Sequence, residues 1–245
     1  SGGLTNNPSG VILIDQTVED GIQCYAGTFT NEGEIRIGEN NTIGGDGIEL
    51  VTAWTFKNNS TGTISIWQAT NFGIYVNSSY GVVENTGNIS IGGLGGDGTG
   101  QPGIAIDGSF FNKPGGTVFV DQTGNVGIVN FTGIFKNEGT TSIGTIASAG
   151  VGIQNTGTIE NLSTGTIVID QATFGIWNGN GIFTNEGLIK IGENGNITIN
   201  AIQNGAQGNS SVFLNSSCSA VIHVFKKDIT DPANNFSNTG IIIKE

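Results

Sequence analysis

The sequence has very little positive charge, because only eight of its 245 residues are Lys or Arg while 20 are Asp or Glu. A net charge of −12 would repel a polyanion, which argues against nucleic acid as a partner and against adhesion to an anionic membrane. No apolar run approaches the ~20 residues that a membrane-spanning helix needs, so we expect no membrane insertion.

Apolar segments with the helical period are also missing, and Pro, His and Cys are scarce at four, one and two residues. Short alternating apolar segments are instead separated by Gly and Asn, and Gly alone accounts for 42 residues. Charged residues make up only 11%, so the composition is not that of a disordered chain. These features indicate an all-β chain with many turns.

A unit of the form F-x-N-x-G-x-I-x-I recurs along the whole chain, most clearly at residues 29–37 and 183–191. Its Asn returns every 23 to 30 residues, at Asn31, Asn58, Asn85, Asn112, Asn137, Asn161, Asn185, Asn215 and Asn238. A second marker, Gly-Ile, lies between these Asn residues. Successive units alternate in kind, because some end a strand in Asp-Gln and the others in Ile-Gly, which indicates a genetic unit of two rungs.

This repeat predicts an all-β, right-handed parallel β-helix of about nine or ten rungs of ~25 residues, each with three short strands. A propeller blade would need longer strands, and the pattern of a leucine-rich repeat is missing. We expect residues 1–245 to form a single β-solenoid domain, cut from a longer secreted or surface protein.

Stacked rungs convert equivalent positions into columns, spaced by ~4.8 Å. The isoleucine strands and the Gly-Ile marker predict two apolar core columns, in which Thr141 is a defect. A third column changes from apolar to amide halfway along, through Cys24, Leu50, Val76, Ile106, Asn130, Asn155, Asn178 and Asn204. Buried amides must be hydrogen-bonded, so we expect Asn ladders at this corner and in the F-x-N column.

The two cysteines lie in the first and ninth rungs, which a rigid solenoid separates by ~35 Å or more. A disulfide requires Cα atoms within ~7 Å. We therefore expect two free thiols, with Cys24 pointing inward.

The phrases Asn85-Thr-Gly87, Asn155-Thr-Gly157 and Asn238-Thr-Gly240 resemble the repeats of large bacterial β-helix adhesins, such as autotransporter passengers and haemagglutinin-like proteins. The resemblance covers nearly the whole chain and carries no active-site signature. It implies a structural or adhesive module at the cell surface or outside the cell. Its implied partners are glycans or other host or cell-surface ligands, together with adjoining repeats of the same chain.

A carbohydrate-active β-helix enzyme, similar to polysaccharide lyases, is the alternative, since a shared fold does not decide activity. A lyase needs a Ca²⁺-binding carboxylate cluster and a basic residue, yet Arg36 is the only Arg, and the lone His223 falls at an outward, exposed strand position. Asp15, Asp121 and Asp170 share a corner position, where we expect them to accept backbone N–H bonds. We therefore expect no catalytic residue and no cofactor.

Exposed aromatic residues are the candidates for ligand binding, because their apolar faces can stack on sugars. Tyr75 and Trp177 occupy outward positions after the Gly-Ile marker, and Trp67 occupies the Asp-Gln corner of the rung that contains Tyr75. Residues 92–97 match the first part of a Ca²⁺-binding nonapeptide repeat, but the match occurs once. We interpret this segment as a loop, with Asp97 as the weak candidate for a Ca²⁺ ligand.

An ice-binding solenoid is a minor alternative, because such proteins display flat rows of Thr. Thr63, Thr117, Thr140 and Thr166 are predicted to form an outward row. Charged and bulky residues interrupt this row and the adjacent Ser row, at Glu34, Arg36, Phe119 and Lys190.

Overall fold

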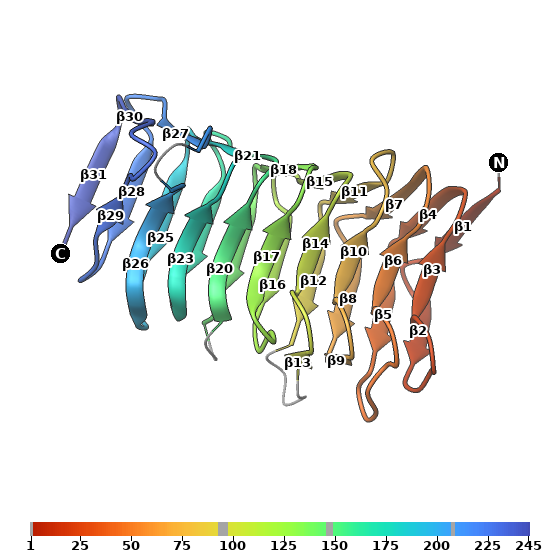
Figure 1. The fold of residues 1–245 in the computed structure, drawn as a ribbon. Coiled ribbons are helices and arrows are strands. Elements are labelled where there is room, and N and C mark those ends of the chain that lie inside the picture. The colour runs from red at the N-terminus through yellow and green to blue at the C-terminus, as the bar shows by residue number, and fades with distance from the viewer. Residues whose placement is uncertain (1, 93–97, 146–148, 207–208) are drawn as a thin grey trace.

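The computed structural model describes residues 2–92, 98–145, 149–206 and 209–245. The chain coils into an elongated parallel β-solenoid, with the N-terminal and C-terminal turns at opposite ends (Figure 1). Each complete turn visits three sheets, which we call A, B and C, and every strand pair within them is parallel. The all-β solenoid expected from the repeat is confirmed, and the described residues include no helix that could cross a membrane.

Sheet A holds the F-x-N segments in ten strands. They are β1 (Gly3–Asn6), β4 (Gly27–Asn31), β7 (Trp54–Asn58), β11 (Val82–Asn85), β15 (Ser109–Asn112), β18 (Ile134–Asn137), β21 (Thr158–Asn161), β24 (Ile182–Asn185), β27 (Val212–Asn215) and β30 (Phe236–Asn238).

Sheet B holds the I-x-I segments in ten strands. They are β2 (Val11–Ile14), β5 (Glu34–Ile37), β8 (Thr63–Ile66), β12 (Asn88–Ile91), β16 (Thr117–Val120), β19 (Thr140–Ile143), β22 (Thr166–Ile169), β25 (Leu188–Ile191), β28 (Val221–Val224) and β31 (Ile241–Lys244).

Sheet C holds the segments around the Gly-Ile marker in nine strands. They are β3 (Ile22–Cys24), β6 (Ile48–Leu50), β10 (Ile74–Val76), β14 (Ile104–Ile106), β17 (Val126–Asn130), β20 (Ala149–Asn155), β23 (Ala172–Asn178), β26 (Ile197–Asn204) and β29 (Ile229–Thr230). A further short pair, β9 (Gln68–Ala69) and β13 (Gly98–Thr99), lies at the corner between sheets B and C.

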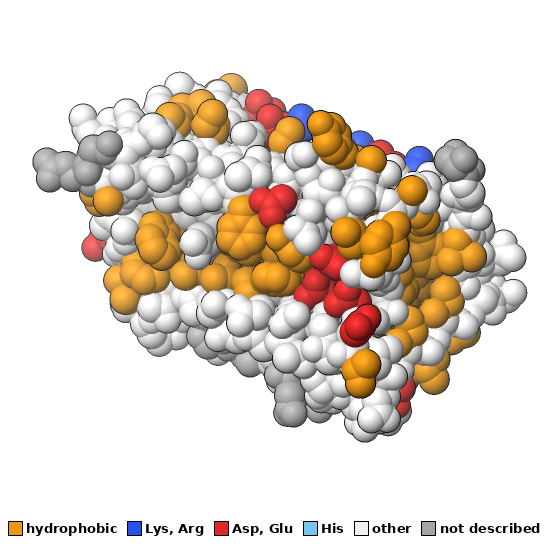
Figure 2. Space-filling model, turned by 45° about the vertical axis from the view of Figure 1, so that its right-hand side comes forward, with side chains coloured by type: hydrophobic (Ala, Val, Ile, Leu, Met, Phe, Trp, Pro, Cys, Tyr) orange, Lys and Arg blue, Asp and Glu red, His pale blue; other side chains and the backbone are white. Residues whose placement is uncertain are grey.

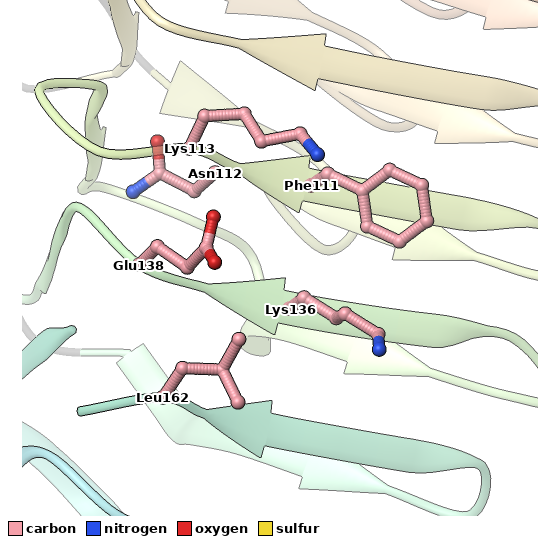
Figure 3. A pocket seen from close by; sticks show the side chains of 6 residues that line it. All are labelled: Phe111, Asn112, Lys113, Lys136, Glu138 and Leu162. Atoms are coloured by element: carbon pink, nitrogen blue, oxygen red, sulfur yellow. The ribbon is translucent and has the colours of Figure 1, made fainter. Parts of the chain in front are cut away.

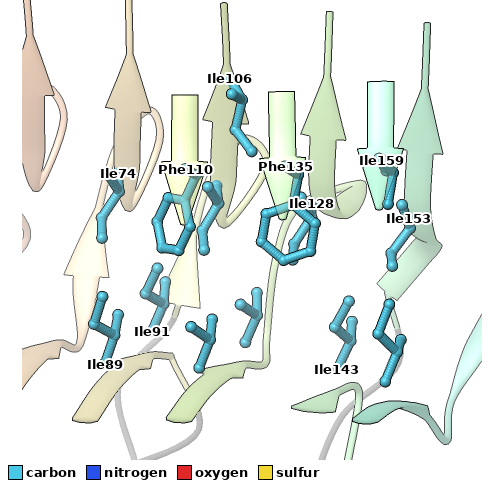
Figure 4. Close-up of a cluster of buried hydrophobic side chains, with 14 of the residues drawn as sticks. Ile74, Ile89, Ile91, Ile106, Phe110, Ile128, Phe135, Ile143, Ile153 and Ile159 are labelled. Atoms are coloured by element: carbon cyan, nitrogen blue, oxygen red, sulfur yellow. The ribbon is translucent and has the colours of Figure 1, made fainter. Parts of the chain in front are cut away.

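The interior is a continuous apolar core in which like residues lie above one another (Figure 4). Ile104, Ile128 and Ile153 are register partners in sheet C, and all three are fully buried. Phenylalanines dominate the inward column of sheet A, where Phe183 and Phe213 stack with their ring centroids 4.6 Å apart. The predicted defect, Thr141, is also buried. Its hydroxyl group is satisfied by a hydrogen bond that it donates to Asn137 Oδ1 at 3.0 Å.

Two ladders of buried asparagine run along the corners of the coil. The first stands at the end of sheet A, where each side-chain Nδ2 donates to Oδ1 of the next Asn at 2.7–2.9 Å, from Asn6 through to Asn238. The second stands at the end of sheet C and covers only Asn130, Asn155, Asn178 and Asn204. Both ladders confirm the expectation from the sequence.

Successive turns alternate in the length of the loop between sheets A and B. One residue separates Asn31 from Gly33, whereas three separate Asn58 from Gly62, and the pattern continues along the chain. The short loop packs against the long loop of the preceding turn, and this contact requires glycine at position 33. A Cβ at Gly33 would stand 2.3 Å from the Gly10 carbonyl oxygen.

The same alternation appears where the chain leaves sheet B. Gly38, Gly92, Gly144 and Gly192 have positive φ at this corner, in the turns whose A–B loop is short. Asp or Trp occupies the corner in most of the other turns. A Cβ at Gly38 would stand 2.3 Å from the Gln68 carbonyl oxygen of the neighbouring turn. The structural unit is therefore a pair of turns, as the two kinds of strand ending predicted.

Candidate functional site

The outer surface of sheet C carries two neighbouring columns of side chains that follow the solenoid axis. In β10, Ile74 and Val76 are buried in the core, so Tyr75 between them points outward. Register continues its column through Ala105, Val129, Gln154 and Trp177. Each residue of the second column lies three residues before the corresponding residue of the first column. The apolar members of both columns form what we call the apolar band: Phe72, Tyr75, Ala105, Val126, Val129, Val151, Phe174 and Trp177.

Each end of the apolar band is an aromatic pair. Phe72 and Tyr75 lie with ring centroids 4.7 Å apart, and Phe174 and Trp177 with centroids 6.1 Å apart. The Tyr75 hydroxyl donates to Asp107 Oδ2 at 3.1 Å, which fixes the direction of its ring. Burial, followed by the nearby Asp107 carboxylate, raises the pKa of Tyr75 to about 12. Trp177 remains 37% exposed. Figure 2 shows hydrophobic side chains gathered along this face, with acidic side chains beside them.

The middle of the apolar band has smaller side chains than its two ends. Ala105, Val126 and Val129 are 0%, 6% and 3% exposed and pack against one another. Phe72, Tyr75 and Val151 are partly buried and pack against them. The surface therefore presents an aromatic pair at each end, which we call the two platforms, with smaller aliphatic side chains between them.

Three carboxylates, Asp20, Asp46 and Glu49, gather at the N-terminal end of these columns, with ligand-type oxygens within 4.8 Å of one another. Asp20 Oδ1 accepts the Asp46 N–H at 2.7 Å, and Asp46 Oδ1 accepts the Phe72 N–H at 3.1 Å. Each aspartate thus ties one turn to the next. Burial raises the pKa of Asp46 to about 6, and burial also raises the pKa of Asp20.

Oxygen ligands of this kind suit Ca²⁺, which takes six to eight of them. This group supplies three carboxylates, and two of them already accept backbone N–H bonds. Glu49 is also occupied, because Gln23 Nε2 and Asn77 Nδ2 each donate to it at 2.7 Å. The arrangement therefore fits a structural link between turns better than a metal centre.

A separate depression of about 310 Å³ lies on the outer surface of sheet A (Figure 3). Phe111, Lys113, Lys136 and Glu138 contribute to its lining. The Lys113 ammonium lies 5.0 Å from the centroid of the Phe111 ring, and Lys136 pairs with Glu160 at 2.7 Å. Both cations are thus already engaged by groups of the protein itself.

The predicted ligand-binding residues do not all meet in one place. Tyr75 and Trp177 share an outward column on sheet C, whereas Trp67 follows β8 at the corner between sheets B and C. Asp97, the weak candidate for a Ca²⁺ ligand, lies outside the described residues. Phe72 and Phe174 were not predicted, although both directly precede the glycine of the Gly-Ile marker and aligning the repeats would have shown their column.

Two of the three corner aspartates, Asp15 and Asp170, accept backbone N–H groups as expected, and Asp121 Oδ2 accepts the Thr145 hydroxyl at 3.0 Å. Asp15 Oδ1 accepts the N–H groups of Asn40 and Asn41 at 2.6 and 3.3 Å, and Asp170 Oδ1 accepts the Asn194 N–H at 3.1 Å. The Asn40 bonds are the main cause that lowers the pKa of Asp15.

The positions considered for lyase chemistry are also engaged locally. Arg36 pairs with Glu34 at 2.7 Å. The expectation that His223 is exposed is wrong, because its side chain is only 18% exposed. The imidazole packs against Phe225, with ring centroids 4.1 Å apart, and Nε2 lies 3.2 Å from Glu245 Oε1.

The predicted threonine row does lie in register on sheet B, but Asn88 interrupts it between Thr63 and Thr117. Phe119 and Val168 stand in the adjacent serine column. These interruptions remove the flat regularity that the ice-binding alternative requires.

Comparison of the chain with protein-family models, with curated proteins and with solved structures finds no match.

Proposed function

We propose that this chain is a non-catalytic adhesive module of a secreted or surface-displayed bacterial protein, and that the apolar band on sheet C binds glycans. The observation that carries the proposal is the presence of two aromatic pairs, Phe72–Tyr75 and Phe174–Trp177, on the outer side of one sheet. The resemblance of the repeats to bacterial β-helix adhesins supports the extracellular location.

The outward position of these aromatic residues is not needed to build the core. The core is already filled by the inward columns, and the outward columns of sheet B mix Thr, Ser and charged residues with single aliphatic ones such as Val11 and Leu13. Apolar side chains grouped on an outer face mark an interaction surface when they are contiguous. Aromatic faces stack on the apolar faces of sugar rings, while polar neighbours bind the hydroxyl groups.

Gln154 supplies such a polar neighbour. It lies in register between Val129 and Trp177 and is partly exposed. Its side-chain amide offers two N–H donors and one carbonyl acceptor, which matches the mixed hydrogen bonding of sugar hydroxyls.

A glycan array on the purified protein tests the proposal, followed by titration of the best glycan into variants. Trp177→Ala should weaken binding by about tenfold, or ~1.4 kcal/mol, with an unchanged melting temperature. The matched control is Tyr80→Ala, because Tyr80 is 77% exposed in the loop after β10 and lies outside the apolar band. Loss of binding in the control, or full binding in the Trp177 variant, would contradict the proposed site.

Trp67→Ala sharpens the same test. If Trp67 contributes, its loss should also weaken binding about tenfold. An effect confined to Tyr75 and Trp177 variants would restrict the site to sheet C.

A glycoside hydrolase is the second candidate, and one observation favours it. Asp46 has the raised pKa that a general acid needs, and it lies beside Glu49 at the end of the apolar band. Against it, Asp46 is only 5% exposed. A reducing-end assay on neutral and acidic polysaccharides decides: release of sugar by the wild type that Asp46→Asn abolishes would replace the binding proposal.

A further inference from the structure

We infer that the ligand of the apolar band is an uncharged, extended polysaccharide that lies along the solenoid axis and bridges both aromatic pairs. This inference rests on the proposed glycan binding and names the class of glycan. It is carried by the spacing of the pairs, the shape of the surface between them and the charge around them.

The spacing requires a long ligand. Strands β10 and β23 are separated in sheet C by β14, β17 and β20. Four strand spacings of ~4.8 Å place Tyr75 and Trp177 about 19 Å apart along the axis. One or two sugar rings cannot touch both aromatic pairs, whereas an oligosaccharide of several units can.

The surface between the pairs leaves room for such a chain. Ala105, Val126 and Val129 have short side chains that Phe72, Tyr75 and Val151 pack against, so none of the three projects beyond the aromatic pairs. The only long polar side chain in this column between Tyr75 and Trp177 is Gln154, which is placed to bind a hydroxyl group beside the Trp177 ring.

The shape also argues against a protein partner. The apolar band is two columns wide, and three of its eight residues are at most 6% exposed. A stable protein interface buries about 800 Å² on each partner, with large anchors near its centre. Here the anchors stand at the two ends and the centre contributes little area, which suits a narrow, linear ligand.

The charge of the face selects against acidic sugars. The strands of sheet C contain no Lys or Arg. Asp20, Asp46 and Glu49 stand at one end, and Asp107 accepts the hydroxyl of Tyr75. Uronates and sulfated sugars would meet these carboxylates, and the Lys227 ammonium that reaches β26 donates to the Thr198 carbonyl at 2.9 Å. Neutral sugars meet no such electrostatic repulsion.

The experiment compares polysaccharides of both charge classes and oligosaccharides of increasing length. Affinity electrophoresis with soluble xylan, galactomannan and mixed-linkage glucan should retard the protein, whereas polygalacturonate and alginate should not, at either low or physiological salt. For the neutral polysaccharide that binds, titration from disaccharide to octasaccharide should show affinity rising at least tenfold once the oligosaccharide spans both pairs, because the second contact is then intramolecular.

Variants separate the two platforms. The double variant Phe174→Ala/Trp177→Ala should bind the octasaccharide no more tightly than the wild type binds the disaccharide, and Phe72→Ala/Tyr75→Ala should behave in the same way. Tyr80→Ala should retain the full dependence on length. Melting curves confirm that each variant is folded.

The outcomes distinguish the inference from the proposed function. If no polysaccharide of either class binds, the glycan-binding function itself is wrong. If acidic polysaccharides bind as well as neutral ones, glycan binding stands and the restriction to uncharged sugars is overturned. If neutral oligosaccharides bind with no dependence on length, glycan binding stands and the bridging of the two pairs is overturned.

Discussion

The corner that joins sheet C to sheet A is built in two ways in the two halves of the solenoid. In the N-terminal half, its inward column is apolar and contains Cys24, Leu50, Val76 and Ile106, whereas in the C-terminal half it is an asparagine ladder beginning at Asn130. The backbone register continues through the junction without interruption, since Ile106 pairs directly with Asn130. The fold therefore tolerates apolar or amide side chains at this corner, provided that apolar side chains stack on apolar ones and amides on amides.

The junction itself shows the cost of mixing them. Asn130 Oδ1 is buried and has no hydrogen-bond partner among the described residues, because Ile106 cannot donate. At its other end the same ladder is closed, since Asn204 Nδ2 donates to Asp231 Oδ1 at 2.7 Å. An unpaired buried acceptor costs roughly 1–3 kcal/mol, so the ladder begins with a penalty that its later members offset.

The largest effect is expected when an amide is placed where no ladder exists. Ile128→Asn, between Ile104 and Ile153 in the core, should lower the free energy of unfolding by about 3–8 kcal/mol, combining lost packing with an unpaired amide. A loss of this size approaches the whole stability of many domains, so soluble expression should fail.

Ile106→Asn is the matched variant, because the same substitution one turn earlier lies next to the unpaired Asn130 Oδ1. The new amide can donate to that oxygen and extend the ladder by one turn. We expect it to cost about 1–3 kcal/mol less than Ile128→Asn, measured by urea unfolding or by soluble yield. Equal costs for the two variants would show that the ladder junction is not the source of the difference.

A smaller effect concerns the acidic group in the N-terminal half. Burial holds the pKa of Asp46 at about 6, above its ordinary value of 3.8. As pH rises from about 4 to 6, the unfolded state loses this proton before the folded state does, so stability falls through that window. Asp46→Asn should flatten the fall and raise stability at pH 7 by about 1–3 kcal/mol, while leaving it nearly unchanged at pH 3.5.

Thermal unfolding across this pH range measures the effect. Asp228→Asn is the control, because the Asp228 side chain is 80% exposed and lies outside the acidic group. A control that stabilises the protein as much as Asp46→Asn would point to net charge rather than to burial.

The smallest expected effect is a difference in reactivity between the two thiols. Cys24 begins the apolar corner column, and burial raises its pKa to about 12, whereas Cys218 is exposed, and both are free. The native protein should therefore react quickly with Ellman's reagent at one thiol only, and Cys218→Ser should abolish that fast phase. Fast reaction of both thiols without denaturant would mean that the N-terminal corner opens readily.

The sequence was sufficient for the solenoid, its core columns and both ladders, because each of these depends on residues that recur at the same point of every turn. Asn130 and Ile106 could be assigned to one column from their distance to the Gly-Ile marker alone. The surface is different, since outward residues need not repeat. The position after Gly-Ile identifies Tyr75 and Trp177 as outward residues, whereas Phe72 and Phe174 precede the marker at a point where the residue type varies along the chain.

The acidic group is not evident from the sequence for the same reason. Asp20, Asp46 and Glu49 are dispersed along the sequence, and only the register of β3 and β6 brings their turns together. Trp67 follows β8 at the corner between sheets B and C, so the turn that it shares with Tyr75 does not by itself place both side chains on one face.

The alternation of short and long loops has a consequence for how such a chain can change length in evolution. A duplication of a single turn would place two short loops, or two long ones, against each other and destroy the fit that Gly33 and Gly38 provide. A duplication of two turns restores the original order at both new boundaries. Genes for this architecture should therefore grow and shrink in steps of about fifty codons, and recombination between unlike turns should yield proteins that fail to fold.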